Sequence, residues 1–271
     1  MGDAAPFARR LIRRARRLIA ERLAVVNRRP LIVLGKEKSG TTAIAALLGE
    51  ATGLTVTLDI PALFIDGLRP ILRGEAELAE LIARQRLAFS RDIIKEPNLT
   101  YIAGQARACF PEARMVAIVR DPRANIRSVF NRMGIRGDLM ELPREAIAGI
   151  PAGWRWHFDE PALLGLAGGD YIALAAQRWN RAAEPVLAAD SSMTVIRYED
   201  FVADRVGAIE RLAERLGLRV VRDIGDDATR QFQPLGADRD CPWSDFFGER
   251  NLATIERICG PAMARFDYST G

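Results

Sequence analysis

A short apolar segment, followed at once by a glycine-bounded loop and a helix, constrains this fold more than any other feature. The apolar segment is Leu31–Leu34, the loop runs from Gly35 to Gly40, and a helix is predicted over about 41–50. Similar apolar runs alternate with helical segments along the rest of the chain. This alternation predicts an α/β fold with three layers, α/β/α, around a central parallel sheet of about five strands.

The other strands are predicted at 54–58, at a segment ending with Ile93-Ile94, at 115–119 and at 194–198. The 271 residues suffice for one such domain, which we expect over 30–271. Residues 134–169 are rich in glycine and proline, carry Trp154, Trp156 and His157, and are expected to form an irregular insertion. A long insertion in a compact domain is typical of a lid or an acceptor-binding element.

The net charge of +4 is unevenly distributed. Residues 1–29 hold nine arginines against one Asp and one Glu, so this segment carries +7 and the remainder about −3. The segment predicts a basic amphipathic helix, and two interpretations remain open. Residues 9–26 could rest on an anionic membrane surface, or the apolar stripe could pack on the domain. No basic or aromatic nucleic-acid motif continues into the body of the chain.

No apolar run is long enough to predict a transmembrane helix. Three scattered cysteines, Cys109, Cys241 and Cys259, favour a reducing compartment, so we expect a cytoplasmic protein that could be membrane-peripheral. The cysteines and the single histidine show no metal-ligand spacing, and no metal site is expected.

The loop Gly35-Lys36-Glu37-Lys38-Ser39-Gly40-Thr41-Thr42 predicts an anion site. Backbone N–H groups of such a loop, with the helix N-terminus behind them, can cradle a phosphate. A nucleoside-triphosphate loop has a lysine after its second glycine, whereas Thr41 stands there in this chain and a lysine lies inside the loop instead. Only three of the 39 basic residues are lysines, and two of them, Lys36 and Lys38, lie in this loop.

At Lys38-Ser39-Gly40-Thr41-Thr42 the chain resembles the sulfotransferases that use 3'-phosphoadenosine 5'-phosphosulfate (PAPS). The resemblance implies a P-loop nucleotide-kinase-like fold and no metal. It implies that Lys38 contacts the bridging oxygen of the leaving group, and that Ser39 to Thr42 hold the 5'-phosphate and sulfuryl oxygens. The product would be 3'-phosphoadenosine 5'-phosphate (PAP).

A second motif supports this resemblance. The family grips the 3'-phosphate with an arginine at a strand end and a serine eight residues later, as Arg120 and Ser128 are spaced. A guanidinium fork and a hydroxyl two helical turns on can hold one phosphate together. Tyr198 resembles the family's adenine-contacting tyrosine, although it could equally be a half-buried aromatic of the sheet. Arg230 and Arg239 lie where the family closes over the 3'-phosphate, with no residue-level match.

The general base is the open point. Cytosolic members place a histidine two residues after a lysine at the third strand end, but here Lys95-Glu96 is followed by Pro97. Carbohydrate-type members instead place a carboxylate about 20–30 residues after the loop lysine, and Asp59, at the end of the predicted second strand, falls near the start of that range. The chain resembles these or bacterial members more closely. We favour Asp59 as the base, with Glu96, His157 and Asp66 as alternatives. Asp59 could instead cap a helix. Lys95 either neutralises sulfuryl oxygens or pairs with Glu96 or Asp92.

The sequence therefore predicts a PAPS-dependent sulfotransferase that acts on a hydroxyl or amine of an acceptor, and the candidate acceptors are saccharides, glycolipids and small metabolites. Two alternatives remain: a P-loop kinase-like phosphotransferase, and a non-catalytic nucleotide-binding protein on the same fold.

Overall fold

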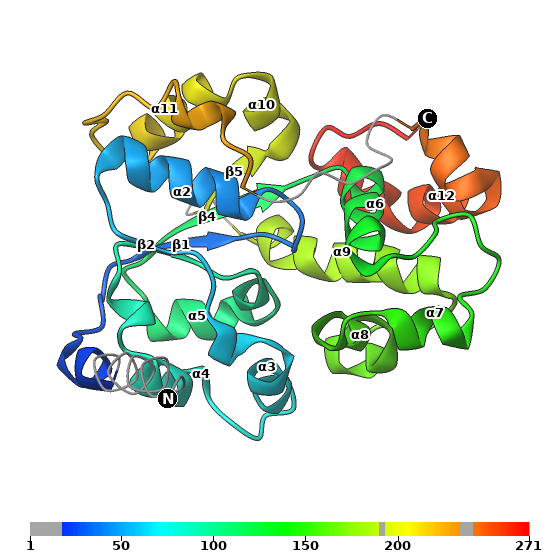
Figure 1. Ribbon diagram of the computed structural model, residues 1–271, viewed down its shortest axis with the longest axis horizontal. Helices are drawn as coiled ribbons and strands as arrows, with labels where there is room; N and C mark the ends of the chain where they lie inside the picture. The colour runs from blue at the N-terminus through cyan, green and yellow to red at the C-terminus, as the bar shows by residue number, and fades with distance from the viewer. Residues whose placement is uncertain (1–17, 190–192, 233–240, 271) are drawn as a thin grey trace, which may run out of the picture.

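The computed structural model describes residues 18–189, 193–232 and 241–270. Its centre is a parallel sheet of five strands in the order β2-β3-β1-β4-β5 (Figure 1). The strands are β1 (Leu31–Leu34), β2 (Val56–Thr57), β3 (Ile93–Lys95), β4 (Arg114–Val119) and β5 (Met193–Arg197). The expected α/β architecture with about five parallel strands is confirmed.

Helices cover both faces of this sheet, as the strand sequences require. Alternate residues of a strand point to opposite faces. Leu31 and Val33 belong to a buried cluster with α2 and α11, whereas Ile32 and Leu34 belong to one that includes α5, α6, α9 and α12. In Figure 1, α2, α10 and α11 lie on one side of the sheet, and α3, α4 and α5 on the other. Both faces of β1 are therefore buried, which explains its continuous apolar sequence.

The α-helices of the described residues follow the chain order. They are α2 (Thr41–Thr52), α3 (Ile65–Leu72), α4 (Leu78–Arg84), α5 (Ala103–Cys109), α6 (Pro122–Met133), α7 (Arg144–Gly149), α8 (Ala152–Asp159), α9 (Tyr171–Leu187), α10 (Tyr198–Ala203), α11 (Arg205–Arg215) and α12 (Trp243–Ala264). Short 3₁₀ helices lie at η1 (Pro61–Leu63), η2 (Ala88–Ser90), η3 (Pro97–Ile102), η4 (Pro161–Leu164) and η5 (Asp227–Thr229).

Helix α6 begins sharply where β4 ends, and this junction positions much of the site. Asp121 caps the helix by accepting a hydrogen bond from the Arg123 N–H at 2.8 Å, and Pro122 occupies the first helical position. Proline suits that position because its missing N–H would have no helical partner. The helix ends at Gly134, which takes the left-handed conformation with φ 72°.

Two expectations about local structure were wrong. The segment 54–58 contributes a strand of only two residues, Val56–Thr57, at the edge of the sheet. The segment 134–169 is not irregular, because it contains α7, α8 and η4. Trp156 and His157 on α8 are buried, so packing against the core organises a sequence whose glycines and prolines suggested a loop.

The described end of the N-terminal segment is helical over 18–23. Two hydrogen bonds join it to the domain: the Leu87 N–H donates to Glu21 Oε2 at 2.9 Å, and Arg86 Nη1 donates to the Arg22 carbonyl at 3.3 Å. The exposed apolar side chains here are Leu18, Ile19, Leu23 and Val25. Across the described ranges, no helix is both long enough and apolar enough to cross a membrane.

Candidate active site

The loop between β1 and α2 has the backbone shape of an anion nest. Gly35, Lys38 and Gly40 all have positive φ, at 146°, 68° and 85°. A left-handed residue within a turn directs neighbouring N–H groups toward one concave side, where an anion can bind. A Cβ at Gly35 would lie 2.7 Å from the Ile118 carbonyl oxygen, so this close approach to β4 requires glycine.

The structure brings the two predicted nucleotide motifs together. Arg120 Nη1 donates a hydrogen bond to the Lys38 carbonyl at 2.7 Å, and its guanidinium lies 4.4 Å from the centre of the Tyr198 ring. Tyr198 in turn packs on the loop so closely that a Cβ at Gly40 would lie 2.3 Å from its ring. Lys38, Gly40, Arg120 and Tyr198 therefore form one contiguous group, although they come from three distant parts of the chain.

Helix α6 contributes a second contact to the loop, which the sequence did not reveal. Asn125 Nδ2 donates to the Glu37 carbonyl at 2.9 Å and to Ser39 Oγ at 3.0 Å. Residues three apart lie on the same face of a helix, so Ser128 shares the face that Asn125 turns to the loop. Ser128 is half-buried there. Ser39 and Thr41 are buried, and Thr42 is half-buried, at the start of α2.

Positive charge gathers around Lys38. Burial lowers the pKa of its ammonium below the ordinary value, and the nearby guanidinium groups of Arg132 and Arg120 lower it further. Mutual repulsion among cations is unfavourable unless an anion binds between them. The arrangement thus suits a ligand with several negative charges.

Beside the loop, Lys95 and Asp59 form an ion pair. Lys95 Nζ lies 2.7 Å from Asp59 Oδ1, and the Lys95 side chain is 3% exposed whereas that of Asp59 is 50% exposed. Lys95 is next to Val33 in the register of β1 and β3, which places it at the strand end where the loop begins. Asp59 does not cap a helix, because Ile60 is the N-cap of η1 and no side chain caps it.

The other base candidates occupy different environments. Glu96 is fully buried and accepts backbone hydrogen bonds from Ile60 at 2.7 Å and Asn98 at 3.0 Å. Burial raises the pKa of its carboxyl to about 7, against the opposing effect of these two bonds. Asp66 is 97% exposed on α3, with Arg69 3.5 Å away. Each carboxylate oxygen of Glu96 thus accepts a hydrogen bond from a backbone N–H, whereas the Asp66 side chain faces solvent.

His157 lies in a buried polar network centred on Glu37, which the sequence also did not reveal. Glu37 accepts from the Tyr101 hydroxyl at 3.1 Å, and its Oε1 lies 3.1 Å from His157 Nε2 and 3.4 Å from Arg178 Nε. Burial alone would raise the pKa of Glu37, but the cationic groups of Lys36 and Arg178 hold it well below its ordinary value. Burial, aided by Arg178, keeps the pKa of His157 well below its usual range.

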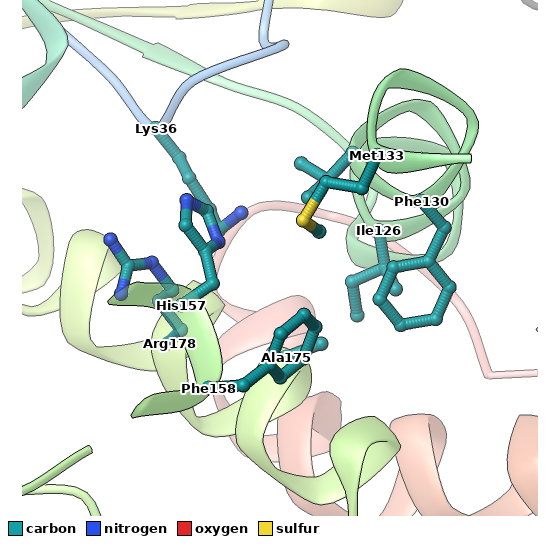
Figure 2. Close-up of a pocket in the computed structure, with 9 residues that line it drawn as sticks. Lys36, Ile126, Phe130, Met133, His157, Phe158, Ala175 and Arg178 are labelled. Atoms are coloured by element: carbon teal, nitrogen blue, oxygen red, sulfur yellow. The ribbon is translucent and has the colours of Figure 1, made fainter. Parts of the chain in front are cut away.

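Lys36 does not share the orientation of Lys38. Its side chain is buried, its ammonium lies 3.5 Å from Glu37 Oε1, and burial lowers its pKa. Figure 2 shows Lys36 descending from the loop toward His157, at the edge of a small pocket between α6, α8 and α9. The apolar lining of this pocket includes Ile126, Phe130, Met133 and Phe158. Of the two loop lysines, Lys36 therefore supports the fold beneath the loop.

Two further expectations concern the chain before α12. Arg230 Nη2 lies 2.6 Å from Glu50 Oε1, and the Arg230 guanidinium lies 4.4 Å from the centre of the Phe232 ring. Arg239 lies outside the described residues. Among the described residues, no group of three or more His, Cys, Asp or Glu side chains could hold a metal ion.

Comparisons with known proteins identify related sequences and folds. A sequence model described as "Sulfotransferase family" matches residues 69–223, more than half of the chain. The match includes Arg120, Ser128 and Tyr198 and begins after the loop. Curated protein sequences give no significant match.

Several solved sulfotransferase structures are similar in fold. The sulfotransferase domain from the curacin biosynthetic pathway is 14% identical, with a TM-score of 0.51 over 92% of this chain and 99% of that chain. Sulfotransferase STF9 from Mycobacterium avium is 14% identical, with a TM-score of 0.52 over 89% of this chain and 77% of that chain. The sulfotransferase domain from the Synechococcus PCC 7002 olefin synthase is 16% identical, with a TM-score of 0.50 over 92% of this chain and 97% of that chain.

Proposed function

Because the chain belongs to the sulfotransferase family, we propose that it transfers the sulfuryl group of PAPS to a hydroxyl or amine of an acceptor. The observation that carries this proposal is the hydrogen bond of 2.7 Å from Arg120 to the Lys38 carbonyl. It joins the two sequence motifs that would grip opposite ends of one nucleotide. A nucleotide with phosphate groups at its 3' and 5' positions is the simplest ligand that would occupy both motifs.

The residues present suit that ligand. The nest of the loop would hold the 5'-phosphate and sulfuryl oxygens through the N–H groups of Gly40 to Thr42, with the hydroxyls of Thr41 and Thr42 nearby. The Ser39 N–H instead donates to the Lys36 carbonyl at 3.1 Å and closes the turn of the loop. Arg120 and Ser128 would hold the 3'-phosphate, and Tyr198 would lie against the adenine. PAPS supplies an activated sulfuryl group whose leaving group is PAP.

In the proposed reaction, the acceptor oxygen or nitrogen bonds to sulfur as the bond from sulfur to the phosphate oxygen breaks. Charge then develops on the leaving phosphate, where Lys38 and the loop N–H groups stabilise it. The acceptor proton passes to Asp59, which Lys95 holds in place by a contact of 2.7 Å. Glu96 is the weaker candidate because backbone N–H groups occupy its carboxylate.

Isothermal titration with PAP, and separately with ATP and Mg²⁺, tests this proposal. We expect metal-independent binding of PAP that is at least tenfold tighter than binding of ATP. Tighter, Mg²⁺-dependent binding of ATP would instead favour a kinase-like phosphotransferase. Binding of PAP without turnover of radiolabelled PAPS against a broad panel of hydroxylated saccharides, glycolipids and metabolites would favour the non-catalytic alternative.

A second proposal concerns the N-terminal segment. We infer that it rests on an anionic membrane surface through the apolar side chains Leu18, Ile19, Leu23 and Val25, which are 58% to 76% exposed. The contacts of Glu21 and Arg22 with the domain leave these side chains outside. The arginines of residues 9–17 add the positive charge that attracts anionic lipid. A membrane-borne acceptor would then be brought close to the enzyme.

A further inference from the structure

Lys38 adopts a backbone conformation that lysine rarely takes. Its φ of 68° lies in the left-handed region, where glycine is the usual residue. A non-glycine residue stays there only when its surroundings enforce that conformation, and such residues cluster at ligand-binding sites. Lys38 is the residue that we place against the leaving group. The groups that enforce its conformation are therefore part of how the site is built.

Side-chain donors hold both peptide groups that flank the Lys38 Cα atom. The carbonyl before it, that of Glu37, accepts a hydrogen bond from Asn125 Nδ2 at 2.9 Å. The carbonyl after it, that of Lys38 itself, accepts one from Arg120 Nη1 at 2.7 Å. The orientations of these two peptide planes define φ and ψ of Lys38. Asn125 and Arg120 thus hold the two peptide groups that set both angles.

This arrangement also sets where the N–H groups point. A carbonyl that faced the anion would repel it, so a nest needs its carbonyls directed away from the ligand. Two carbonyls of this loop are directed toward donors at the end of β4 and on α6. Asn125 also donates to Ser39 Oγ at 3.0 Å, which extends the support by one residue.

Asn125 is well placed to act as a rigid support. It is fully buried, on the first turn of a helix that Asp121 and Pro122 define. Its Oδ1 is buried and has no hydrogen-bond partner among the described residues, which is an unfavourable environment for an amide. An apolar side chain would avoid that cost. The two bonds that the amide donates to the loop are the evident gain.

We propose that Asn125 is a positioning residue for the donor nucleotide, holding the Glu37–Lys38 peptide so that the loop is already shaped for the 5'-phosphosulfate. Asn125 acts through Lys38 and the loop, without touching the nucleotide. Ser128 lies three residues later on the same helix face, so one rigid helix would align the grips for both ends of the nucleotide. This inference rests on the proposed function.

The variant Asn125→Ala tests it, with two nucleotides as probes. Loss of a buried donor to the loop should weaken binding of PAP about tenfold to a hundredfold. Binding of adenosine 3'-phosphate, which lacks the 5'-phosphate, should change less than about twofold, because it uses only the other grip. An equal loss for both nucleotides would overturn the inference, as would unchanged binding of PAP.

Asn251→Ala is the matched control. Asn251 is also buried, and its Nδ2 donates two hydrogen bonds, to the carbonyls of Gly137 at 2.8 Å and Leu139 at 2.9 Å. This variant should unfold at a lower temperature and bind PAP as the wild type does. A wild-type protein that bound no PAP would refute the proposed function itself, a result distinct from failure of Asn125→Ala alone.

The nearly isosteric variant Asn125→Asp provides a pH-dependent readout. An ionised carboxylate would repel the Glu37 carbonyl, whereas a protonated one could donate to it. The ratio of wild-type to variant affinity for PAP should therefore fall as the pH falls. A ratio that does not change with pH would contradict the inference. Failure of both Asn125 variants to fold would also overturn it, because the fold rather than the loop would then require the amide.

Discussion

Lys95 Nζ lies 2.7 Å from Asp59 Oδ1, although the two residues are 36 positions apart in the chain. The ammonium is almost completely buried and the carboxylate is half-exposed. The buried ammonium of Lys95 fixes the position of the Asp59 carboxylate, and the carboxylate stays accessible to solvent. This combination gives the carboxylate that we propose as the general base a fixed position that solvent and an acceptor can reach.

Replacing this carboxylate should therefore remove proton transfer while leaving the nucleotide site intact. For Asp59→Asn we expect kcat to fall by about 10² to 10⁴, with PAP affinity unchanged within about twofold. Initial rates with radiolabelled PAPS and titration with PAP measure the two quantities. Asp66→Asn, which changes an exposed carboxylate on α3, should keep wild-type activity. If Asp59→Asn kept the wild-type kcat, a group other than Asp59 would be the general base.

Removing the ammonium of Lys38 should slow catalysis strongly without unfolding the protein. For Lys38→Ala we expect kcat to fall by about 10² to 10³, the size of effect seen when one stabilising donor for a developing charge is lost. The half-buried Lys38 side chain is not part of either buried apolar cluster, so the thermal midpoint should stay close to that of the wild type. Arg84→Ala, a change of an exposed cation on α4, is the control. Full activity of Lys38→Ala would refute the role assigned to it.

The serine of α6 offers the cleaner test of the 3'-phosphate grip, because Arg120 also supports the loop. Ser128→Ala should weaken PAP binding about tenfold through loss of a hydrogen bond to a charged group. Binding of adenosine 5'-phosphosulfate, which has no 3'-phosphate, should not change. The control is Ser90→Ala, because the Ser90 hydroxyl donates to the Leu87 carbonyl at 2.8 Å in η2. Equal effects on both nucleotides would place Ser128 outside the grip.

Glu96 should make the stability of the protein depend on pH. Burial raises its pKa from an ordinary 4.5 to about 7, so the folded state favours the protonated carboxyl. Its contribution to stability is full below pH 4.5 and is lost as the pH rises through about 7. Relative to Glu96→Gln, the wild type should lose about 3 kcal/mol of unfolding free energy across this window. Urea denaturation at several pH values measures the difference.

The matched control for this pH effect is Glu112→Gln, because Glu112 is a surface carboxylate paired with Arg29. That variant should track the wild type at every pH. If Glu96→Gln tracks the wild type as well, the carboxyl of Glu96 titrates normally in the folded protein.

Polar substitutions in the N-terminal segment should weaken membrane binding. We expect the double variant Leu23→Ser, Val25→Ser to bind vesicles of mixed anionic and zwitterionic lipid about tenfold or more weakly than the wild type, because less apolar surface enters the interface. Vesicle sedimentation at low and high salt measures this. Val221→Ser removes an exposed apolar side chain elsewhere on the surface and should have no effect. Equal vesicle binding by the wild type and both variants would show that Leu23 and Val25 are not part of a membrane-binding surface.

The sequence predicted the parts of the site that local patterns encode. The segment Lys38 to Thr42 could be recognised because its strand, loop and helix start are contiguous in the sequence. Arg120 and Ser128 could be recognised by their spacing of eight residues across a strand end and the helix that follows. The sheet followed from apolar runs whose length and composition suit buried parallel strands. Boundaries were less certain, and the edge strand β2 proved shorter than its alternating pattern suggested.

The sequence could not predict contacts between distant segments that have no motif. Asn125 is one polar residue among several on α6, and only the packing of α6 against the loop reveals its role. Glu37 has no motif of its own in the sequence, yet it is the centre of a network with Tyr101, His157 and Arg178. Lys95 was expected to pair with Glu96 or Asp92, within its own segment. Its partner is Asp59, which follows the neighbouring strand β2 and is far away in the sequence.

The contact between His157 and Glu37 limits how the enzyme can be redesigned. His157 belongs to the segment 134–169, and its ring lies 3.1 Å from a carboxylate of the loop that we expect to bind the nucleotide. An exchange of this segment for that of another sulfotransferase would therefore disturb the donor side unless the incoming helix placed an equivalent imidazole against Glu37. Chimaeras that keep Trp156, His157 and Phe158 while varying the remainder are the ones that should retain function.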